Sequence, residues 1–341
     1  MNDAWYWDRY WNANRIAACC AGEDLNYGGA ILLGWQAFFD GFDTGSRLLD
    51  IGTGNGAVAL MAAAAAQRSD KSFEIHAVDS AAIDPVQFVP GNRALMADVT
   101  FHGSTKAESL PFEAAVFDGV TGQYALEYTD IPATLRELNR VCRSGARLRF
   151  VIHAQEGSPV TLARASLDEL TVAFVDSGIG AKARECMRTA FAFERAATDD
   201  PRKRLLAQNA RESYVDAARA LDARYASSPS PEVIGEFLNL VRGIWDRRSR
   251  FSLDEALSPL DAFDLELSAH RARLGAMCYS ARDRSGILEL LELCEETGFD
   301  ESQSNELRAS GDQRLLGWVV TATREDRAPC DYNEPHTGSP R

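Results

Sequence analysis

The chain has 341 residues, of which 45% are hydrophobic and 25% are charged, and its formal net charge is −14. This length and composition predict a globular protein with one large domain or two ordinary ones. No stretch reaches the roughly 18 uninterrupted apolar residues of a bilayer span, and the start MNDAWYWDRYW lacks a secretory signal pattern. We therefore expect a cytoplasmic protein with no membrane partner, and the acidic charge disfavours nucleic acid as a partner.

The seven cysteines form no C-x-x-C pair and no His/Cys cluster with the spacing of zinc ligands. We therefore predict reduced thiols and no metal site. The adjacent Cys19 and Cys20 are predicted to pack on a helix, because free cysteine is usually buried, with a redox role as the alternative.

In chain order, residues 1–45 read as helical, and strands and helices then alternate as far as Ala154. This pattern predicts a parallel, doubly wound sheet. The predicted strands are RLLDI (47–51), EIHAVDS (74–80), VTFHGS (99–104), AVFDGVTG (115–122) and ARLRFVIHA (146–154).

After Ala154 about 130 residues show little strand signal, and apolar residues at three- and four-residue steps predict an amphipathic helix over 200–226. Ser230 before Pro231 predicts a helix start, and SLDEAL from Ser252 predicts a capping box. This region reads as a helical insertion of nearly neutral charge.

The sheet is predicted to resume after the insertion. SGILELLELCEETGFDE (285–301) reads as a helix closed by Gly298, and LLGWVVTATR (315–324) as a strand. The polar segment 325–341 is rich in proline and glycine, which predicts a disordered tail.

The stretch LLDIGTGNGAVAL (48–60) brings the chain from a strand through three glycines into a helix. Such a turn lets the backbone approach a ligand at the carboxyl edge of the sheet. Two ligand classes use it, dinucleotides and S-adenosylmethionine, and GTGNGA alone satisfies the weak G-x-G-x-x-A pattern of the first. Asp50 before the glycines would repel a pyrophosphate and suit an ammonium group, whereas Asp79 can bind ribose hydroxyls in either case.

The chain resembles the class I S-adenosylmethionine-dependent methyltransferases that modify small molecules. The resemblance rests on LDIGTGNG, on AVDS, on AESLPFEAAVFDGVTGQYALEY and on LRELNRVCRSGARLRFVIH. It covers residues 45–154 well and the final helix and strands in outline. It implies a Rossmann-like α/β fold, with a doubly wound, mostly parallel seven-stranded sheet, an N-terminal helical segment and a large α-helical insertion after the fifth strand.

The resemblance also implies roles for individual residues. Asp79 would bind the ribose, and Gln123 and Tyr124 would border the methyl group. Where the family often has an acid for the adenine amino group, this chain has Lys106, so Ser104 or Thr105 is the candidate for that contact. The residues implied to line the methionine end of the cofactor are Asp50, Gly52, Thr53, Gly54 and Gly56.

Methyl transfer from a sulfonium depends mainly on alignment of nucleophile and methyl carbon, and a general base is optional. His153 at the end of the fifth strand is the candidate base, because imidazole accepts protons near neutral pH; a hydrogen-bonded structural histidine is the alternative. Tyr124 is predicted to line the catalytic pocket, with core packing as the alternative. Glu127 either binds substrate or caps the next helix.

Two further clusters carry alternatives. The aromatic run WYWDRYW (5–11) either packs as one helical face or closes over the cofactor by cation–π attraction. The basic stretch RGIWDRRSRF from Arg242 is either a solvated helix face or a surface that recognises an anionic substrate group or a partner.

The resemblance predicts an N-terminal lid segment (1–45), a cofactor-binding domain (46–154 and 286–324) and a helical substrate cap (155–285). The expected function is methyl transfer from S-adenosylmethionine to an O, N or C atom of a small-molecule substrate, and a homodimer is possible. The alternatives are methylation of tRNA or protein, a non-catalytic S-adenosylmethionine-binding scaffold, and a nicotinamide oxidoreductase.

Overall fold

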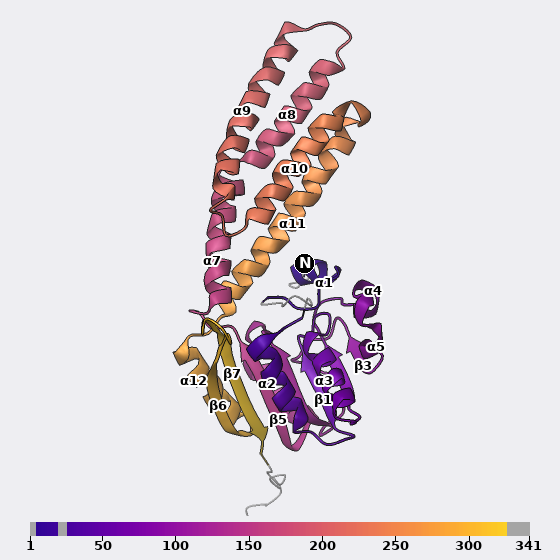
Figure 1. Cartoon of the computed structure of the whole chain (residues 1–341), viewed down its shortest axis with the longest axis vertical. Helices are drawn as coiled ribbons and strands as arrows, with labels where there is room; N and C mark the ends of the chain where they lie inside the picture. Colours follow the sequence, from indigo (N-terminus) through magenta and orange to yellow (C-terminus); the bar gives the residue numbers. More distant parts are fainter. Residues whose placement is uncertain (1–4, 20–25, 326–341) are drawn as a thin grey trace, which may run out of the picture. The chain divides into compact units, whose positions relative to one another are not determined.

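A computed structural model describes residues 5–19 and 26–325 of the chain. It comprises two compact units, each with its own apolar core (Figure 1). The helical unit consists of Met1–Tyr10 and Ser158–Ser280, and the sheet unit of Trp11–Gly157 and Ala281–Arg341. The predicted tail, 325–341, lies outside the described residues except for Glu325.

The sheet unit contains a seven-stranded sheet in the order β3-β2-β1-β4-β5-β7-β6 (Figure 1). The first five strands run parallel, and β7 is antiparallel to both of its neighbours. The predicted Rossmann-like, mostly parallel sheet is confirmed. The strands are β1 (Arg47–Ile51), β2 (Glu74–Val78), β3 (Val99–His102), β4 (Phe117–Gln123), β5 (Cys142–Ile152), β6 (Phe299–Arg308) and β7 (Leu315–Arg324).

Helices cover both faces of this sheet, so successive residues of a central strand enter different cores. Leu48 of β1 packs in a core with α2 and α3, whereas Leu49 packs in a core with α6 and α12. This double burial explains why RLLDI reads as a continuous apolar run without alternation. The helices of this unit are α2 (Gly29–Asp40), α3 (Ala57–Arg68), α4 (Pro85–Phe88), η1 (Pro90–Asn92), α5 (Arg93–Met96), η2 (Leu126–Tyr128), α6 (Ile131–Val141) and α12 (Arg284–Glu296).

The edge strand β6 has a polar sequence, FDESQSNELR, and most of its residues are exposed or half-buried. An edge strand needs only one hydrogen-bonded neighbour and can leave its side chains in water, so it carries little apolar signal. This strand is therefore missing from the elements predicted individually from the sequence.

The helical unit is built around four helices that contact one another in a ring, α8 to α9, α9 to α10, α10 to α11 and α11 to α8. The predicted capping box is present, because the Ser252 backbone N–H donates to Glu255 and the Glu255 N–H donates to the Ser252 hydroxyl. The helices are α7 (Ser158–Leu170), the π-helix η3 (Thr171–Asp176), α8 (Ile179–Glu194), α9 (Pro201–Tyr225), α10 (Pro231–Arg247), η4 (Arg248–Arg250) and α11 (Leu253–Ser280).

The N-terminal helix α1 (Trp5–Trp11) spans the boundary between the two units. Trp7 and Tyr10 make an edge-to-face contact with ring centroids 5.7 Å apart, and Arg273 of α11 lies 4.6 Å from the Tyr10 ring. The next residue, Trp11, belongs to the sheet unit and is buried there.

Candidate active site

The loop between β1 and α3 contains three glycines in the left-handed backbone region. Gly52, Gly54 and Gly56 have φ angles of +58°, +54° and +91°, which side chains with a Cβ rarely adopt. A Cβ on Gly52 would collide with Ala125, and one on Gly54 with the indole of Trp11. Backbone conformation and close packing both require glycine here.

Asp50 near the end of β1 is 3% exposed, and both carboxylate oxygens are engaged. The Thr53 hydroxyl donates to Oδ2 at 2.6 Å, and the Thr121 hydroxyl donates to Oδ1 at 2.8 Å. Burial raises the pKa of Asp50 to about 7, although these two hydrogen bonds oppose the shift. The carboxyl group therefore ties the glycine loop to β4.

Asp79 follows β2 and holds the same loop from its other side. Its Oδ2 accepts from the backbone N–H of Gly54 at 2.7 Å, and its Oδ1 accepts from that of Ala81 at 2.8 Å. These two bonds fix the Asp79 carboxylate against the glycine loop at the end of β2.

The segment after β3 lies beside Asp79. The backbone N–H of Thr105 donates to the Asp79 carbonyl at 2.8 Å, and that of Ser104 donates to the Ala81 carbonyl at 2.9 Å. Ser104 is exposed with φ +53°, and Lys106 is exposed as well. Ser104 and Thr105 are therefore next to Asp79 at the end of β2. The residue that follows them is Lys106, at the position where the family often has an acid.

Gln123 at the end of β4 is 7% exposed, and only one of the two polar atoms of its side-chain amide has a hydrogen-bond partner. Its Oε1 accepts from the Trp35 indole N–H at 2.7 Å, which assigns the other end as Nε2. That Nε2 is buried without a hydrogen-bond partner. A buried donor without a partner is costly, so this amide is a ready donor for a ligand acceptor atom.

His153 at the end of β5 is 2% exposed and is oriented by Glu127. Glu127 Oε1 lies 2.8 Å from His153 Nδ1 and accepts from the His153 backbone N–H at the same distance. Nδ1 facing a carboxylate places the proton there, which leaves the Nε2 lone pair for the other side. Cys19 Sγ lies 3.6 Å from Nε2.

Of the two roles predicted for Glu127, the structure excludes the helix cap, and substrate binding stays a prediction. The cap of α6 is Asp130, whose side chain accepts from the Ala133 N–H, so the capping alternative for Glu127 is wrong. Its Oε2 is buried without a hydrogen-bond partner. The sequence offers no signal for the pair, because 26 residues separate Glu127 from His153.

Tyr124 covers the other side of His153. The two rings are stacked, with centroids 4.0 Å apart and an interplanar angle of 21°. Tyr124 adopts φ +54°, and its hydroxyl donates to the Leu316 carbonyl at 3.1 Å. A non-glycine residue in this region is strained, and such strain is concentrated at functional sites.

Asn55 fastens the N-terminal segment to the glycine loop, and sequence reasoning missed it. Its Nδ2 carries two hydrogens and donates to the carbonyls of Trp11 and Arg15 at 2.9 and 2.7 Å, and the Ala13 carbonyl lies 3.3 Å from the same nitrogen. The side chain is fully buried, and the Trp11 indole fills the space beside Gly54. The one signal was an asparagine between the second and third glycines of the motif.

The carboxyl ends of β1, β2, β4 and β5 thus gather the glycine loop, Asp79, Gln123, Tyr124 and His153 at one edge of the sheet. These groups fit S-adenosylmethionine: a carboxylate at the end of β2 suits a ribose diol, and the orphaned Gln123 amide suits an acceptor atom. Among residues 5–19 and 26–325, no group of three His, Cys, Asp or Glu side chains is placed to hold a metal ion.

Comparison with known proteins agrees with this geometry. Residues 49–150 match the family model described as a methyltransferase domain. No curated protein sequence matches the chain. Within the part of the chain that the structure describes, no helix has the length and apolar character of a bilayer span.

Solved structures similar to the chain include a bacterial protein described without an activity and two methyltransferases. The YcgJ protein of Bacillus subtilis is 27% identical with a TM-score of 0.31, and the match covers 41% of this chain and 58% of that one. Phosphoethanolamine N-methyltransferase 2 of Haemonchus contortus is 13% identical with a TM-score of 0.44, covering 95% and 57%. An S-adenosylmethionine-dependent methyltransferase of Aquifex aeolicus is 19% identical with a TM-score of 0.32, covering 37% and 65%.

The sheet order, the glycine loop and the family match define the class: the chain contains a class I methyltransferase domain. The cofactor of this domain is S-adenosylmethionine. The chain spans a little over half the length of the first two structures, at 58% and 57%.

Proposed function

We propose that the protein transfers a methyl group from S-adenosylmethionine to an O, N or C atom of a small molecule. The observation that carries this proposal is the Glu127–His153 pair at the carboxyl edge of the sheet. Bound S-adenosylmethionine supplies an electrophilic methyl group, and the protein must align the acceptor and remove its proton where it has one.

In this proposal His153 Nε2 is the proton acceptor, and Glu127 is the positioning residue. Glu127 keeps the Nδ1 proton in place and stabilises the imidazolium that forms when Nε2 is protonated. Cys19 is adjacent to Nε2 in the structure, so the acceptor group must take the position of its thiol.

The cofactor roles proposed from the family resemblance are compatible with the contacts. Asp79 would accept from the ribose hydroxyls, and Ser104 or Thr105 would contact the adenine. Gln123 would donate its orphaned N–H near the reacting end. Asp50 would line the methionine end of the cofactor, and its carboxyl group, which is 3% exposed and held by two threonine hydroxyls, also supports the glycine loop.

Burial of the base favours a small acceptor over tRNA or protein. His153 is 2% exposed, so only an acceptor that enters the site can reach Nε2. The net charge of −14 also opposes a polyanionic substrate.

We further propose that the helical insertion is the substrate cap. The helical insertion begins a few residues after His153 and ends shortly before Arg282. The Arg282 N–H donates to the His153 carbonyl at 2.8 Å. The Gln155 N–H donates to the Arg282 carbonyl at 2.9 Å. The returning connection is thus bonded to the backbone of the proposed base, and the outgoing connection is bonded to the returning one, so that a substrate cap would be linked to the acceptor site.

The test is transfer of tritium from methyl-labelled S-adenosylmethionine to three separate acceptor pools: the small-molecule fraction of a cell extract, total tRNA and total protein. We expect labelling of the small-molecule pool, lost with His153→Ala. Labelling of tRNA or protein instead would overturn the substrate class. S-adenosylhomocysteine binding without labelling of any pool would support the non-catalytic scaffold.

A further inference from the structure

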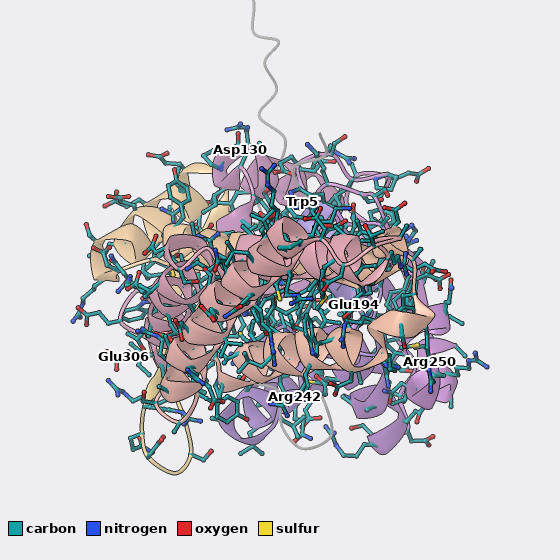
Figure 2. All side chains as sticks on the ribbon, turned by 90° about the horizontal axis from the view of Figure 1, so that it is seen from above. Trp5, Asp130, Glu194, Arg242, Arg250 and Glu306 are labelled. Carbon is teal, nitrogen blue, oxygen red and sulfur yellow. The ribbon has the colours of Figure 1, made fainter. Side chains whose placement is uncertain are left out.

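A cavity of about 330 Å³ lies within the helical unit, between α8, α9 and α10. Figure 2 looks down on this unit and labels Glu194 of α8 and Arg242 of α10, two of the helices that form its walls. The volume is that of a site for a small organic molecule. Met187 and Val241, both buried, form part of its apolar lining.

Two arginines of the lining differ from the other arginines around them. Arg211 and Arg242 have no ion pair with any described carboxylate, although the chain has an excess of acids. In the same unit, several arginines pair with acids: Arg184 with Asp261, Arg224 with Glu169, and Arg248 with Glu194. Three arginines line the cavity: Arg219 pairs with Asp216, whereas Arg211 and Arg242, which are exposed, form no ion pair with a described carboxylate.

An aromatic ring helps to place one of these guanidinium groups. Arg211 lies 5.6 Å from the ring centroid of Trp245, which also lines the cavity. A cation–π contact orients a guanidinium without using its N–H donors. Those donors remain available for a carboxylate, which a guanidinium binds through two parallel hydrogen bonds.

The remaining polar lining is compatible with an anion. Burial raises the pKa of Tyr214 to about 12, so its phenol stays protonated and can donate a hydrogen bond. Asp222 is the one acid in the lining, and it is exposed. The lining combines apolar side chains, an indole, a phenol and three arginines, of which Arg211 and Arg242 have no described carboxylate as ion-pair partner.

We propose that this cavity binds an aromatic organic anion, with its ring on the Met187 and Val241 side and its anionic group on Arg211 and Arg242. The site is built within the helical unit and uses none of the residues assigned to cofactor binding or proton removal. It assigns the basic stretch from Arg242, which the methyl-transfer proposal leaves unused, to anion recognition and not to a purely solvated helix face.

The test is calorimetric titration of the full-length protein with 2-naphthoate and with its neutral analogue 2-naphthamide. We expect one naphthoate per chain and binding of the amide weaker by at least about tenfold, because charge-assisted hydrogen bonds are lost. Arg211→Gln combined with Arg242→Gln should weaken naphthoate by at least about tenfold as well. Arg202→Gln, an exposed change on the same helix α9, is the matched control and should leave binding unchanged.

Two further variants separate this cavity from the cofactor site. Val241→Trp should abolish naphthoate binding by filling the cavity while S-adenosylhomocysteine still binds, which shows that the protein is folded. Asp79→Ala should weaken S-adenosylhomocysteine and leave naphthoate unchanged. Absence of naphthoate binding, equal binding of acid and amide, or loss of naphthoate only in Asp79→Ala would each overturn the proposal.

Discussion

The sheet unit and the helical unit treat polar side chains differently. In the sheet unit, Asp50, Asp79, Glu127 and His153 are buried and held by hydrogen bonds at the carboxyl ends of parallel strands. In the helical unit most charged side chains are on the surface, and some of them form ion pairs, such as Arg224 with Glu169. The contrast is consistent with the two proposals, which assign methyl transfer to the fixed polar groups of the sheet unit and anion binding to the helical unit.

Gly54→Val should give the largest effect in the sheet unit. Valine would be strained at φ +54° and would collide with Trp11, at a cost of about 2–5 kcal/mol in unfolding free energy and with loss of S-adenosylhomocysteine binding. Urea unfolding and calorimetric titration measure both. The matched control is Gly91→Ala, because Gly91 has open space around its Cα and no left-handed backbone. Normal binding by Gly54→Val would contradict the assignment of the loop.

Glu127→Gln tests whether the buried hydrogen bond between Glu127 and His153 contributes to methyl transfer. We expect the methyl-transfer rate to fall by about 10²–10³-fold with S-adenosylhomocysteine affinity unchanged, because a positioned general base contributes about this much. Steady-state rates across pH with the acceptor found in the labelling experiment measure the effect.

The control for that variant is Glu108→Gln, since Glu108 also accepts a backbone N–H, that of Asp130. If both variants keep the wild-type rate and pH profile, Glu127 and His153 are structural residues and the acceptor needs no base.

Asp50→Asn should change how stability depends on pH. The folded pKa of about 7 exceeds the unfolded value of 3.8, so the folded state holds the extra proton between these values and stability falls as pH rises through them. The variant should remove that fall and raise the unfolding free energy at about pH 8 by up to about 4 kcal/mol. Urea unfolding at about pH 5 and about pH 8 is the measurement. A wild-type protein that is more stable at the higher pH, with no difference in the variant, would contradict the raised pKa.

Ser252→Ala should give the smallest effect and confine it to the helical unit. It removes the hydroxyl half of the capping box of α11, which costs about 1 kcal/mol. Ser249→Ala, three residues away in η4, is the control. Hydrogen exchange should show faster opening of α11 with S-adenosylhomocysteine binding unchanged; an equal effect of the two changes would argue against the cap.

Local sequence patterns predict much of the sheet unit and little of the relations between distant residues. The glycine loop and Asp79 are readable because strand, turn and helix follow one another in the chain. The Glu127–His153 contact and the hold of Asn55 on the N-terminal segment arise only when separate elements are packed together. Strand β6 has no apolar pattern because it lies at the sheet edge.

The cavity of the helical unit could not be predicted from the sequence either, because it also depends on how separate elements pack together. Its lining comes from three helices, and the feature that marks Arg211 and Arg242 is the absence of an acidic partner among the described residues. Spacing along one helix cannot reveal such an absence, although it did single out the basic stretch from Arg242.

The most direct test of the central claim is calorimetric titration of the wild-type protein and of Asp79→Ala with S-adenosylmethionine, S-adenosylhomocysteine and NADH. We predict micromolar binding of both adenosyl ligands by the wild type, at least about 100-fold weaker binding by the variant, and no binding of NADH. Binding of NADH alone, or equal affinity of the two proteins for S-adenosylhomocysteine, would contradict the assignment of this sheet edge as the methyl-donor site.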